Sequence, residues 1–394
     1  MNQTILGYVM ARDEWPLLGQ SMAHALTNIV DELVVINHCS SDGTEAGLRK
    51  IQGMFPGRVR VFALEDPRFL QEEATALFAA LTSAQDFDWF YVFDADEFLL
   101  TSTEASLKQI LLSIDSNVDA LRYEVTQFMV ESSGYRGPGA NLNLRPIFPS
   151  SFAPMSNALI AEEIENDVLN YFDISFPSKL IVRGSLAHRL TAGAHNLRDS
   201  GKVLEKSLDR TVVQAGHMPL RSRDYLEQKA RTGKALVELG FPPSHGWQNQ
   251  MLARIADAGD LDKYWEAHSY DPITTKVDGH HFPPLGAQDE KLVQAMHLAL
   301  SAFELAQDDP TPLEDRAFRL EPTGARDLTW AGVMDAVRLQ TEAHLEAIAS
   351  RDEAIASRDE AVEATRSIQQ SKSWRATYPM RFLLGAIIRR HSGD

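Results

Sequence analysis

Short apolar runs alternate with helical patterns through the first third of this sequence, and this alternation limits the fold more than any other feature. The expected strands, which have the length and apolar character of buried strands, are residues 4–11, 33–37, 59–64 and 89–93. The expected helices are residues 14–29, 44–54 and 74–83. Strands and helices that alternate at this pace predict βαβ units and an α/β fold, with a mainly parallel sheet covered by helices on both faces.

The middle of the chain is less regular. Residues 121–129 and 179–183 are expected to be strands, and helical patterns dominate from residue 223 to about residue 306. Between the two strands, residues 132–146 form a long irregular stretch rich in glycine and proline. Connections of this kind are usually functional or disordered.

Composition narrows the class of protein. The chain has 394 residues and is 44% apolar, which is enough to bury a core, and its formal net charge of −17 argues against nucleic acid as a partner. Its single cysteine, Cys39, excludes a disulfide framework and a Cys-cluster zinc site. The sequence has neither a signal-peptide pattern at its N-terminus nor an apolar window long enough to span a bilayer. We therefore expect the protein in the cytoplasm.

An apolar strand runs directly into three carboxylates in the stretch YVFDADEFLL, residues 91–100. In open parallel sheets, ligands gather at the carboxyl ends of the strands. Acidic groups this close raise each other's pKa unless a positive group separates them. Mg²⁺ or Mn²⁺ prefers a couple of carboxylates together with phosphate oxygens, so the pattern predicts that Asp94 and Asp96 hold a metal on a diphosphate. The alternative is an ordinary strand-end turn, where Asp side chains hydrogen-bond to the backbone.

A second stretch, ELVVINHCSSDGT at residues 32–44, is a buried strand followed by a polar loop. Asp42 and Gly43 lie in this loop, and Thr44 can cap the helix that follows. A strand, loop and helix in this order suit a nucleotide, because the helix N-terminus favours negative charge. A tight turn with a helix cap, and no ligand, explains the pattern equally well.

With VMARDE at residues 9–14, these two stretches resemble the nucleotide-binding half of family-two-like glycosyltransferases with the GT-A fold. The matching pieces are RDE at residues 12–14, SSDGT at residues 40–44 and DADEF at residues 94–98. The resemblance covers about residues 1–235 and is specific as a set. It implies a Rossmann-like GT-A sheet, a nucleotide-sugar donor, and nucleotide contacts from Arg12, Glu14, Asp42 and Asp94.

The resemblance extends more weakly downstream. SKLIVRGS at residues 178–185 implies that Lys179 lies near the sugar nucleotide, and residues 217–233 resemble a histidine-containing family stretch. There His217 is the candidate that completes the metal shell, with Arg221 and Lys229 as phosphate partners. Imidazole does bind such metals, and a departing diphosphate needs cations. The spacing of Arg221 and Lys229 is also consistent with one helical face, whether functional or merely solvated.

The sequence departs from the family pattern in two places. Many members end the second strand with an acidic residue that reads uracil, whereas this chain has Asn37, which can still hydrogen-bond to a base. The Gln-x-x-Arg-Trp signature of processive synthases is absent from the sequence, which favours an enzyme that adds a single sugar.

An inverting transferase also needs a general base for the acceptor hydroxyl. Asp199 is our candidate, although no spacing singles it out from the other downstream acids, which are Glu162, Glu163, Glu165 and Asp167. A retaining enzyme would not need this base, and the sequence does not decide the stereochemistry.

The last sixty or so residues have a different character. IASRDEA occurs twice in tandem at residues 348–361, with one strong apolar position per heptad, which indicates a helical stalk or a weak coiled coil that could join two copies of the chain. The tail at residues 371–394 interleaves basic and aromatic residues. Such a segment binds an anionic membrane surface, here the inner face of the cytoplasmic membrane, or docks on protein.

The sequence thus predicts a GT-A transferase domain at residues 1–235, a helical extension at 236–330, a stalk at 331–370 and an amphipathic tail at 371–394. The predicted function is Mn²⁺- or Mg²⁺-dependent transfer of a sugar from a nucleotide diphosphate, UDP by preference, to a glycan or lipid-linked acceptor in surface polysaccharide synthesis. One alternative is a sugar nucleotidyltransferase, but residues 11–18 lack the glycine-rich loop expected after the first strand. The other alternative is a non-catalytic, membrane-tethered scaffold.

Overall fold

The computed structural model describes most of the chain up to residue 304. The described segments are residues 3–64, 71–82, 84–101, 105–148, 157–198, 201–243, 246–277, 280–281 and 284–304, together with residue 357. The predicted stalk, apart from residue 357, the predicted tail and the candidate base Asp199 lie outside these described residues.

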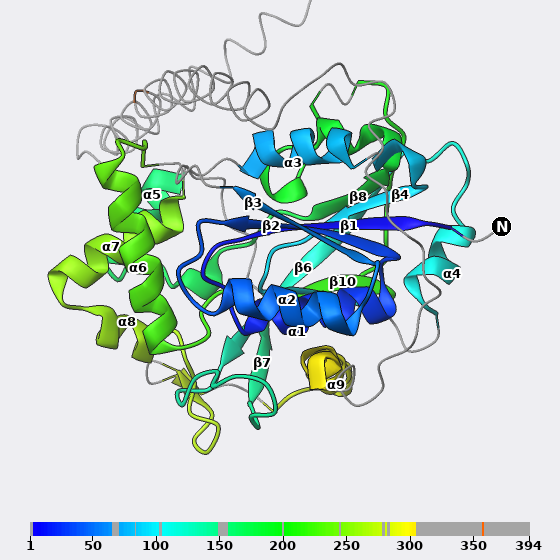
Figure 1. Ribbon diagram of the computed structural model, residues 1–394. Helices are drawn as coiled ribbons and strands as arrows, with labels where there is room; N and C mark the ends of the chain where they lie inside the picture. The colour runs from blue at the N-terminus through cyan, green and yellow to red at the C-terminus, as the bar shows by residue number, and fades with distance from the viewer. Residues whose placement is uncertain are drawn as a thin grey trace, which may run out of the picture.

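The N-terminal half of the sheet is parallel, as the strand and helix alternation predicts. Its strands lie in the order β3-β2-β1-β4, and every neighbouring pair is parallel (Figure 1). The strands are β1 (Ile5–Ala11), β2 (Glu32–His38), β3 (Val59–Leu64) and β4 (Trp89–Val92). Each lies within one residue of its predicted bounds. The carboxyl ends of β1 and β4 therefore lie side by side.

Helices cover both faces of these strands, which explains why the strands are apolar throughout. Ile5 and Val9 of β1 pack with α1 and α2 in one buried cluster, whereas Leu6 and Tyr8 pack with Phe78 of α3 in another. Figure 1 shows α1 and α2 below the sheet and α3 above it. The helices are α1 (Leu17–Asn28), α2 (Thr44–Met54) and α3 (Gln71–Leu81). The predicted mixed α/β class, with a mainly parallel sheet flanked by helices, is confirmed.

The second half of the sheet changes strand direction. It continues from β4 in the order β8-β6-β10-β5, where β8 and β5 are antiparallel to their neighbours. Two shorter strands, β7 and β9, add to β6. The strands of this half are β5 (Glu97–Thr101), β6 (Ala120–Val130), β7 (Leu144–Ile147), β8 (Lys179–Arg183), β9 (Glu205–Ser207) and β10 (Val213–His217).

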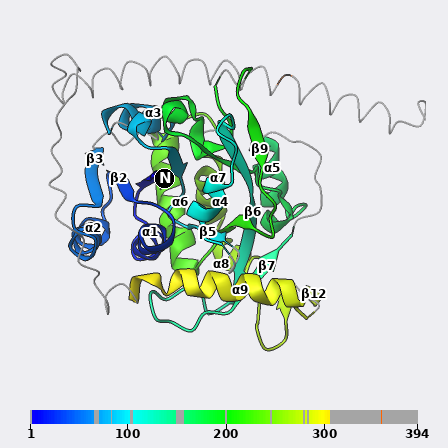
Figure 2. The same ribbon diagram turned by 90° about the vertical axis from the view of Figure 1, so that its right-hand side faces the viewer.

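The downstream helices pack onto this second half. The helices are α4 (Leu107–Leu112), α5 (Asn157–Glu165), α6 (Arg223–Glu238), α7 (Trp247–Ala258), α8 (Leu261–Ala267) and α9 (Ala287–Leu300). Figure 2 shows α9 along one edge of the molecule, where it contacts α1, β5 and β7. Residues of α6 to α9 share a buried cluster with Phe98 and Phe128 of the sheet. The predicted domain boundary at residues 235/236 falls within α6.

Short elements complete the described chain. They are the short 3-10 helices η1 (Ala84–Asp86), η2 (Tyr171–Asp173), η3 (Gly184–Arg189) and η4 (Ala192–Ala194), and the antiparallel pair of β11 (Lys276–Val277) and β12 (His280–His281). Among the described helices, none has both the length and the apolar character needed to cross a bilayer.

Candidate active site

A cavity of about 670 Å³ opens at the carboxyl ends of β1 and β4. Its lining includes Arg12 and Glu14 after β1, and the acidic turn after β4. On the opposite side it is bounded by residues of α6 and α7. Of the predicted site residues, the cavity lining includes Arg12, Glu14, Asp94, Asp96, Lys179, His217 and Lys229.

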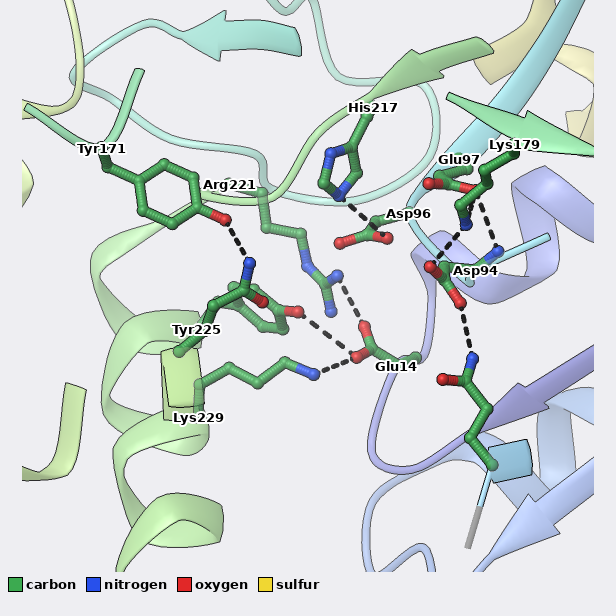
Figure 3. Close-up of polar contacts among 12 residues, drawn as sticks. Glu14, Asp94, Asp96, Glu97, Tyr171, Lys179, His217, Arg221, Tyr225 and Lys229 are labelled. Carbon is green, nitrogen blue, oxygen red and sulfur yellow. Dashed lines mark hydrogen bonds and ion pairs between the residues drawn. The ribbon is translucent and has the colours of Figure 1, made fainter. Parts of the chain in front are cut away.

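The acidic stretch is a tight turn between β4 and β5. The backbone N–H of Glu97 donates to the carbonyl of Asp94 at 3.0 Å. Lys179, the first residue of β8, donates to Asp94 Oδ2 at 2.7 Å and to Glu97 Oε2 at 2.5 Å (Figure 3). Both acids line the cavity, but the side chain of Asp94 is 37% exposed and that of Glu97 is 3% exposed, so Asp94 is the more accessible of the two. A buried lysine therefore compensates two of the three carboxylates.

The third carboxylate of the turn has a different partner. Oδ1 of Asp96 lies 3.6 Å from Nε2 of His217. Strand register explains this contact, because His217 ends β10 directly opposite Glu97, the first residue of β5. The imidazole packs edge-on against the ring of Phe176, with 5.5 Å between ring centroids. Its Nδ1 is buried and makes no hydrogen bond within the described residues, which leaves Asp96 as its polar partner.

Glu14 gathers the two cations that were predicted to bind phosphate. Arg221 donates to Glu14 Oε2 at 2.7 Å, and Lys229 donates to Glu14 Oε1. Tyr225, a residue that the sequence analysis did not single out, adds a hydrogen bond to Glu14 Oε1 at 3.3 Å. Its ring also lies under the guanidinium of Arg221, 3.5 Å from Cζ to the ring centroid. Figure 3 shows this cluster beside the Asp96–His217 pair.

The structure corrects the expectation that Arg221 and Lys229 share one helical face. Arg221 precedes α6, which begins at Arg223, whereas Lys229 lies within this helix. They meet because both reach Glu14, more than 200 residues earlier in the chain. Arg221 is buried behind the cavity wall and is not part of its lining.

Two of the predicted nucleotide contacts also lie outside the cavity lining. Asp42 is exposed, and its Oδ1 accepts from Thr44 N at 2.9 Å at the start of α2. Thr44 itself is the first residue of this helix, after the N-cap residue Gly43, and does not cap it, contrary to the prediction from the sequence. The other carboxylate oxygen of Asp42 accepts from Trp15 N at 3.2 Å, while Asp13 Oδ1 accepts from Asp42 N at 3.1 Å. These bonds connect the loop after β1 to the loop after β2. At the end of β2, the cavity lining contains His38 rather than Asn37.

Comparisons with known proteins give remote similarities only. No protein-family model and no curated protein matches the chain. S. aureus TarS 1-349 is 14% identical over 77% of this chain and 81% of that chain, with a TM-score of 0.33. Glucosyl-3-phosphoglycerate synthase from Mycobacterium tuberculosis, in complex with Mn²⁺, UDP and phosphoglyceric acid, is 17% identical over 61% and 80%, with a TM-score of 0.32. Similarity at this level leaves the function to be argued from the site.

A third structure has a different chemistry. It is described as a putative glucose-1-phosphate thymidylyltransferase from Bacillus anthracis in complex with a sucrose. It is 8% identical over 54% of this chain and 89% of that chain, with a TM-score of 0.29.

Burial and charge act against each other on the titratable groups of the site. Burial raises the pKa of Asp94, but Lys179 reverses this effect and the pKa falls below its usual value. Burial lowers the pKa of His217, but Asp96 outweighs it and the pKa of the imidazole is raised. Burial likewise raises the pKa of Asp96, and His217 more than reverses it. The pair is therefore an ionised carboxylate beside a protonated imidazole, and it has no net charge.

A carboxylate and an imidazole are suitable ligands for a hard divalent cation whose remaining ligands are substrate oxygens. Within the described residues, no group of three or more His, Cys, Asp or Glu side chains forms a ready-made metal cage. Mg²⁺ and Mn²⁺ do not need one, because they commonly bind through one or two side chains, substrate phosphates and water. Asp96 and His217 would provide such a pair once the metal displaces the imidazole proton, and Asp94 lies beside them with Lys179 and Gln71 as its partners.

Proposed function

We propose that this protein is a metal-dependent glycosyltransferase that moves a sugar from a nucleotide diphosphate, UDP by preference, to a glycan or lipid-linked acceptor. The cavity at the carboxyl ends of β1 and β4 is the proposed donor site. Asp96 and His217 would hold Mn²⁺ or Mg²⁺, with Asp94 beside them.

The charge balance around this cavity is the observation that carries the proposal. Four carboxylates (Glu14, Asp94, Asp96 and Glu97) form ion pairs with four basic side chains (Lys179, His217, Arg221 and Lys229), and Arg12 adds a fifth basic side chain to the cavity lining. Buried charges that are left unpaired are costly, so a ligand has to preserve this balance. A nucleotide diphosphosugar carries two negative charges and brings no net charge together with one divalent cation, so the balance changes only by the proton that His217 releases when its nitrogen binds the metal.

Each part of the site has a distinct task in the proposed reaction. Lys179 holds Asp94 and Glu97 in place, so that the turn keeps its shape while the ligand exchanges. Lys229 lines the cavity and would stabilise charge that develops on the departing diphosphate, while Arg221 holds Glu14, to which Lys229 is also paired. A bound divalent cation would add Lewis-acid stabilisation of the same leaving group.

The acceptor site is proposed at the side of the cavity that residues of η2 and α7 form. The rings of Tyr171 and Trp247 stack with 6.5 Å between centroids, and Gln248 donates to the hydroxyl of Tyr171 at 3.0 Å. Trp247 and Gln248 are both in the cavity lining. Aromatic faces next to amide groups suit a hydroxylated substrate, with apolar surface for its ring and hydrogen bonds for its hydroxyls.

The test is the thermal unfolding of the full-length protein with UDP, in Mn²⁺ and in EDTA. A ligand at 100 times its Kd adds about 2.7 kcal/mol to the free energy of unfolding, so UDP should raise Tm in Mn²⁺ and not in EDTA. A panel of UDP-sugars should then reveal one that releases UDP. Absence of any shift would favour the scaffold alternative, and pyrophosphate release from UTP with a sugar 1-phosphate would favour the nucleotidyltransferase.

A further inference from the structure

His195 lines the cavity but has no part in the donor site described above. It follows the short helix η4 (Ala192–Ala194), and its Nδ1 lies 3.2 Å from the carbonyl oxygen of Ser178. Ser178 directly precedes Lys179 in the chain, which brings the imidazole to the wall of the cavity that also carries the acidic turn. The backbone of His195 is fixed as well, because Arg122 donates to its carbonyl at 3.1 Å.

The contact with Ser178 assigns the tautomer of the imidazole. A carbonyl oxygen can only accept, so Nδ1 carries a proton, and in the neutral ring Nε2 then carries the lone pair. Nε2 of His195 makes no hydrogen bond to any of the described residues. The bond from Nδ1 holds the ring in place, and Nε2 is left unprotonated and able to accept a proton, as a general base requires.

The backbone before His195 keeps this nitrogen uncovered. Gly193 has φ +68°, and a Cβ built on it would lie 2.6 Å from Nε2 of His195. Any other residue at this position would therefore press its side chain against the nitrogen. The next residue, Ala194, also has a positive φ, +57°, which is rare for a residue with a side chain. Backbone strain of this kind gathers at functional sites.

The electrostatic surroundings keep the imidazole neutral. Burial lowers the pKa of His195, and the charges of Lys179 and Arg122 lower it further. The hydrogen bond to Ser178 and the charge of Asp94 oppose these effects without cancelling them. At neutral pH the ring is therefore ready to accept a proton.

The carboxylates that the described residues bring to the cavity are all engaged by basic partners. Lys179 holds Asp94 and Glu97, His217 faces Asp96, and Glu14 is held by Lys229 and Arg221. Depressed pKa values also make Asp94 and Asp96 weak bases. His217 faces a carboxylate, whereas Nε2 of His195, a residue of the same cavity lining, has no hydrogen-bond partner among the described residues.

We propose that His195 is the general base of the transfer reaction, an inference that rests on the proposed function. Its Nε2 takes the proton of the acceptor hydroxyl, and the acceptor oxygen forms a bond to the anomeric carbon of the donor. The bond from this carbon to the diphosphate oxygen breaks, and its electron pair leaves with the diphosphate. The attack is then direct, so the sugar is transferred with inversion of configuration. Asp199, our candidate from the sequence, is not needed in this role.

The variant that isolates this role is His195→Asn in the full-length chain. The amide of Asn can still donate to Ser178, so the local fold is kept while Nε2 is removed. With the UDP-sugar that the wild type hydrolyses, UDP release should fall by about 100-fold or more, the usual contribution of a general base. The Mn²⁺-dependent Tm shift with UDP should not change. The matched control is His188→Asn, because this exposed histidine of η3 is outside the cavity lining.

Two further results test the role of His195. Imidazole added to His195→Ala should restore UDP release, which a merely structural histidine would not show. Proton NMR of the sugar as it is released should show the inverted anomer. A rate within about threefold of wild type for His195→Asn, or a retained anomer, would overturn the proposal. A wild type that shows no UDP-dependent shift and no UDP release would remove the proposed function itself, and this inference with it.

Discussion

Nε2 of His217 lies 3.6 Å from Oδ1 of Asp96, although 120 residues separate them in the chain. Antiparallel pairing of β5 and β10 brings them together, because His217 is directly opposite Glu97. The pairing therefore converts two distant motifs into one acid–imidazole pair at the mouth of the donor cavity.

Asp96→Asn and His217→Asn should each abolish Mn²⁺-dependent stabilisation by UDP. The first substitution removes a negative charge from the proposed metal pair, and the second removes its nitrogen ligand. In each variant UDP release should fall by about 100-fold or more. Asp94→Asn should lose activity as well, because Lys179 is then left with Glu97 alone.

Differential scanning fluorimetry with UDP in Mn²⁺ and in EDTA measures the binding of UDP to these variants. The control is Asp86→Asn on exposed η1, and a full Mn²⁺-dependent shift in either of the first two variants would contradict the metal assignment.

Glu14→Gln should strongly destabilise the ligand-free protein. Glu14, Arg221 and Lys229 have side chains that are 8%, 5% and 21% exposed, so the substitution leaves two largely buried cations without their carboxylate. Loss of one partner of a buried ion pair costs about 3–5 kcal/mol in the free energy of unfolding. Urea denaturation measures this loss.

Ligand and control experiments sharpen the Glu14 prediction. UDP with Mn²⁺ should recover part of the lost stability, because the diphosphate supplies the missing negative charge. Glu45→Gln removes the partner of Arg49 in an exposed i,i+4 pair and should change stability little. Equal stability of Glu14→Gln and wild type would mean that the buried cations do not depend on this carboxylate.

The sequence was sufficient to predict the strands of the parallel half. Adjacent residues such as Val34 and Val35 are buried on opposite faces of a sheet that helices cover on both sides, so the strands are unbroken apolar runs in the sequence. The turn after β4 was also recognisable, since Asp94 and Asp96 end such a run. The apolar run and the acids that end it are adjacent in the chain, so both can be recognised in the sequence without knowledge of the fold.

The partners of these acids could not be predicted in the same way. Lys179 reaches Asp94 across 85 positions and Arg221 reaches Glu14 across 207 positions. Neither contact leaves a periodic signal in the sequence. The helical spacing of Arg221 and Lys229 suggested a shared face, but the helix begins two residues after Arg221. Such contacts depend on the antiparallel strands of the second half, whose pairing the sequence does not reveal.

His24 should make the stability of the protein depend on pH. It is buried between α1 and β5, where Nε2 donates to the carbonyl of Leu99 at 2.8 Å and Nδ1 accepts from Asn28 at 3.2 Å. Burial lowers its pKa below the usual 6.5, more than the Leu99 bond raises it. The unfolded chain therefore binds this proton at a higher pH than the folded chain does.

The sign of the effect follows from this difference. The stability due to neutral His24 is fully present above pH 6.5 and falls as pH drops toward the folded pKa, by at most about 1.4 kcal/mol per pH unit for one proton. Urea denaturation between pH 7.5 and 5 should show this loss in the wild type. His24→Gln should show a flatter profile, whereas His188→Gln at an exposed site should keep the wild-type slope. Equal slopes for His24→Gln and wild type would show that another group titrates.

Gly233 and Gly53 should respond in opposite ways to alanine. Gly233 lies where α6 crosses α7, and a Cβ at this position would lie 1.8 Å from the backbone oxygen of Asn249. The two helices must therefore separate, at a cost of about 1–3 kcal/mol or more. Because Thr232 and Asn249 both line the cavity, UDP release should fall as well. Gly53 lies in α2 with nothing within 4 Å of its Cβ position, so Gly53→Ala should stabilise the protein by about 0.5–1 kcal/mol. Chemical denaturation of the two variants beside the wild type measures both effects, and a Gly233→Ala protein as stable as the wild type would rule out the close approach of α6 and α7.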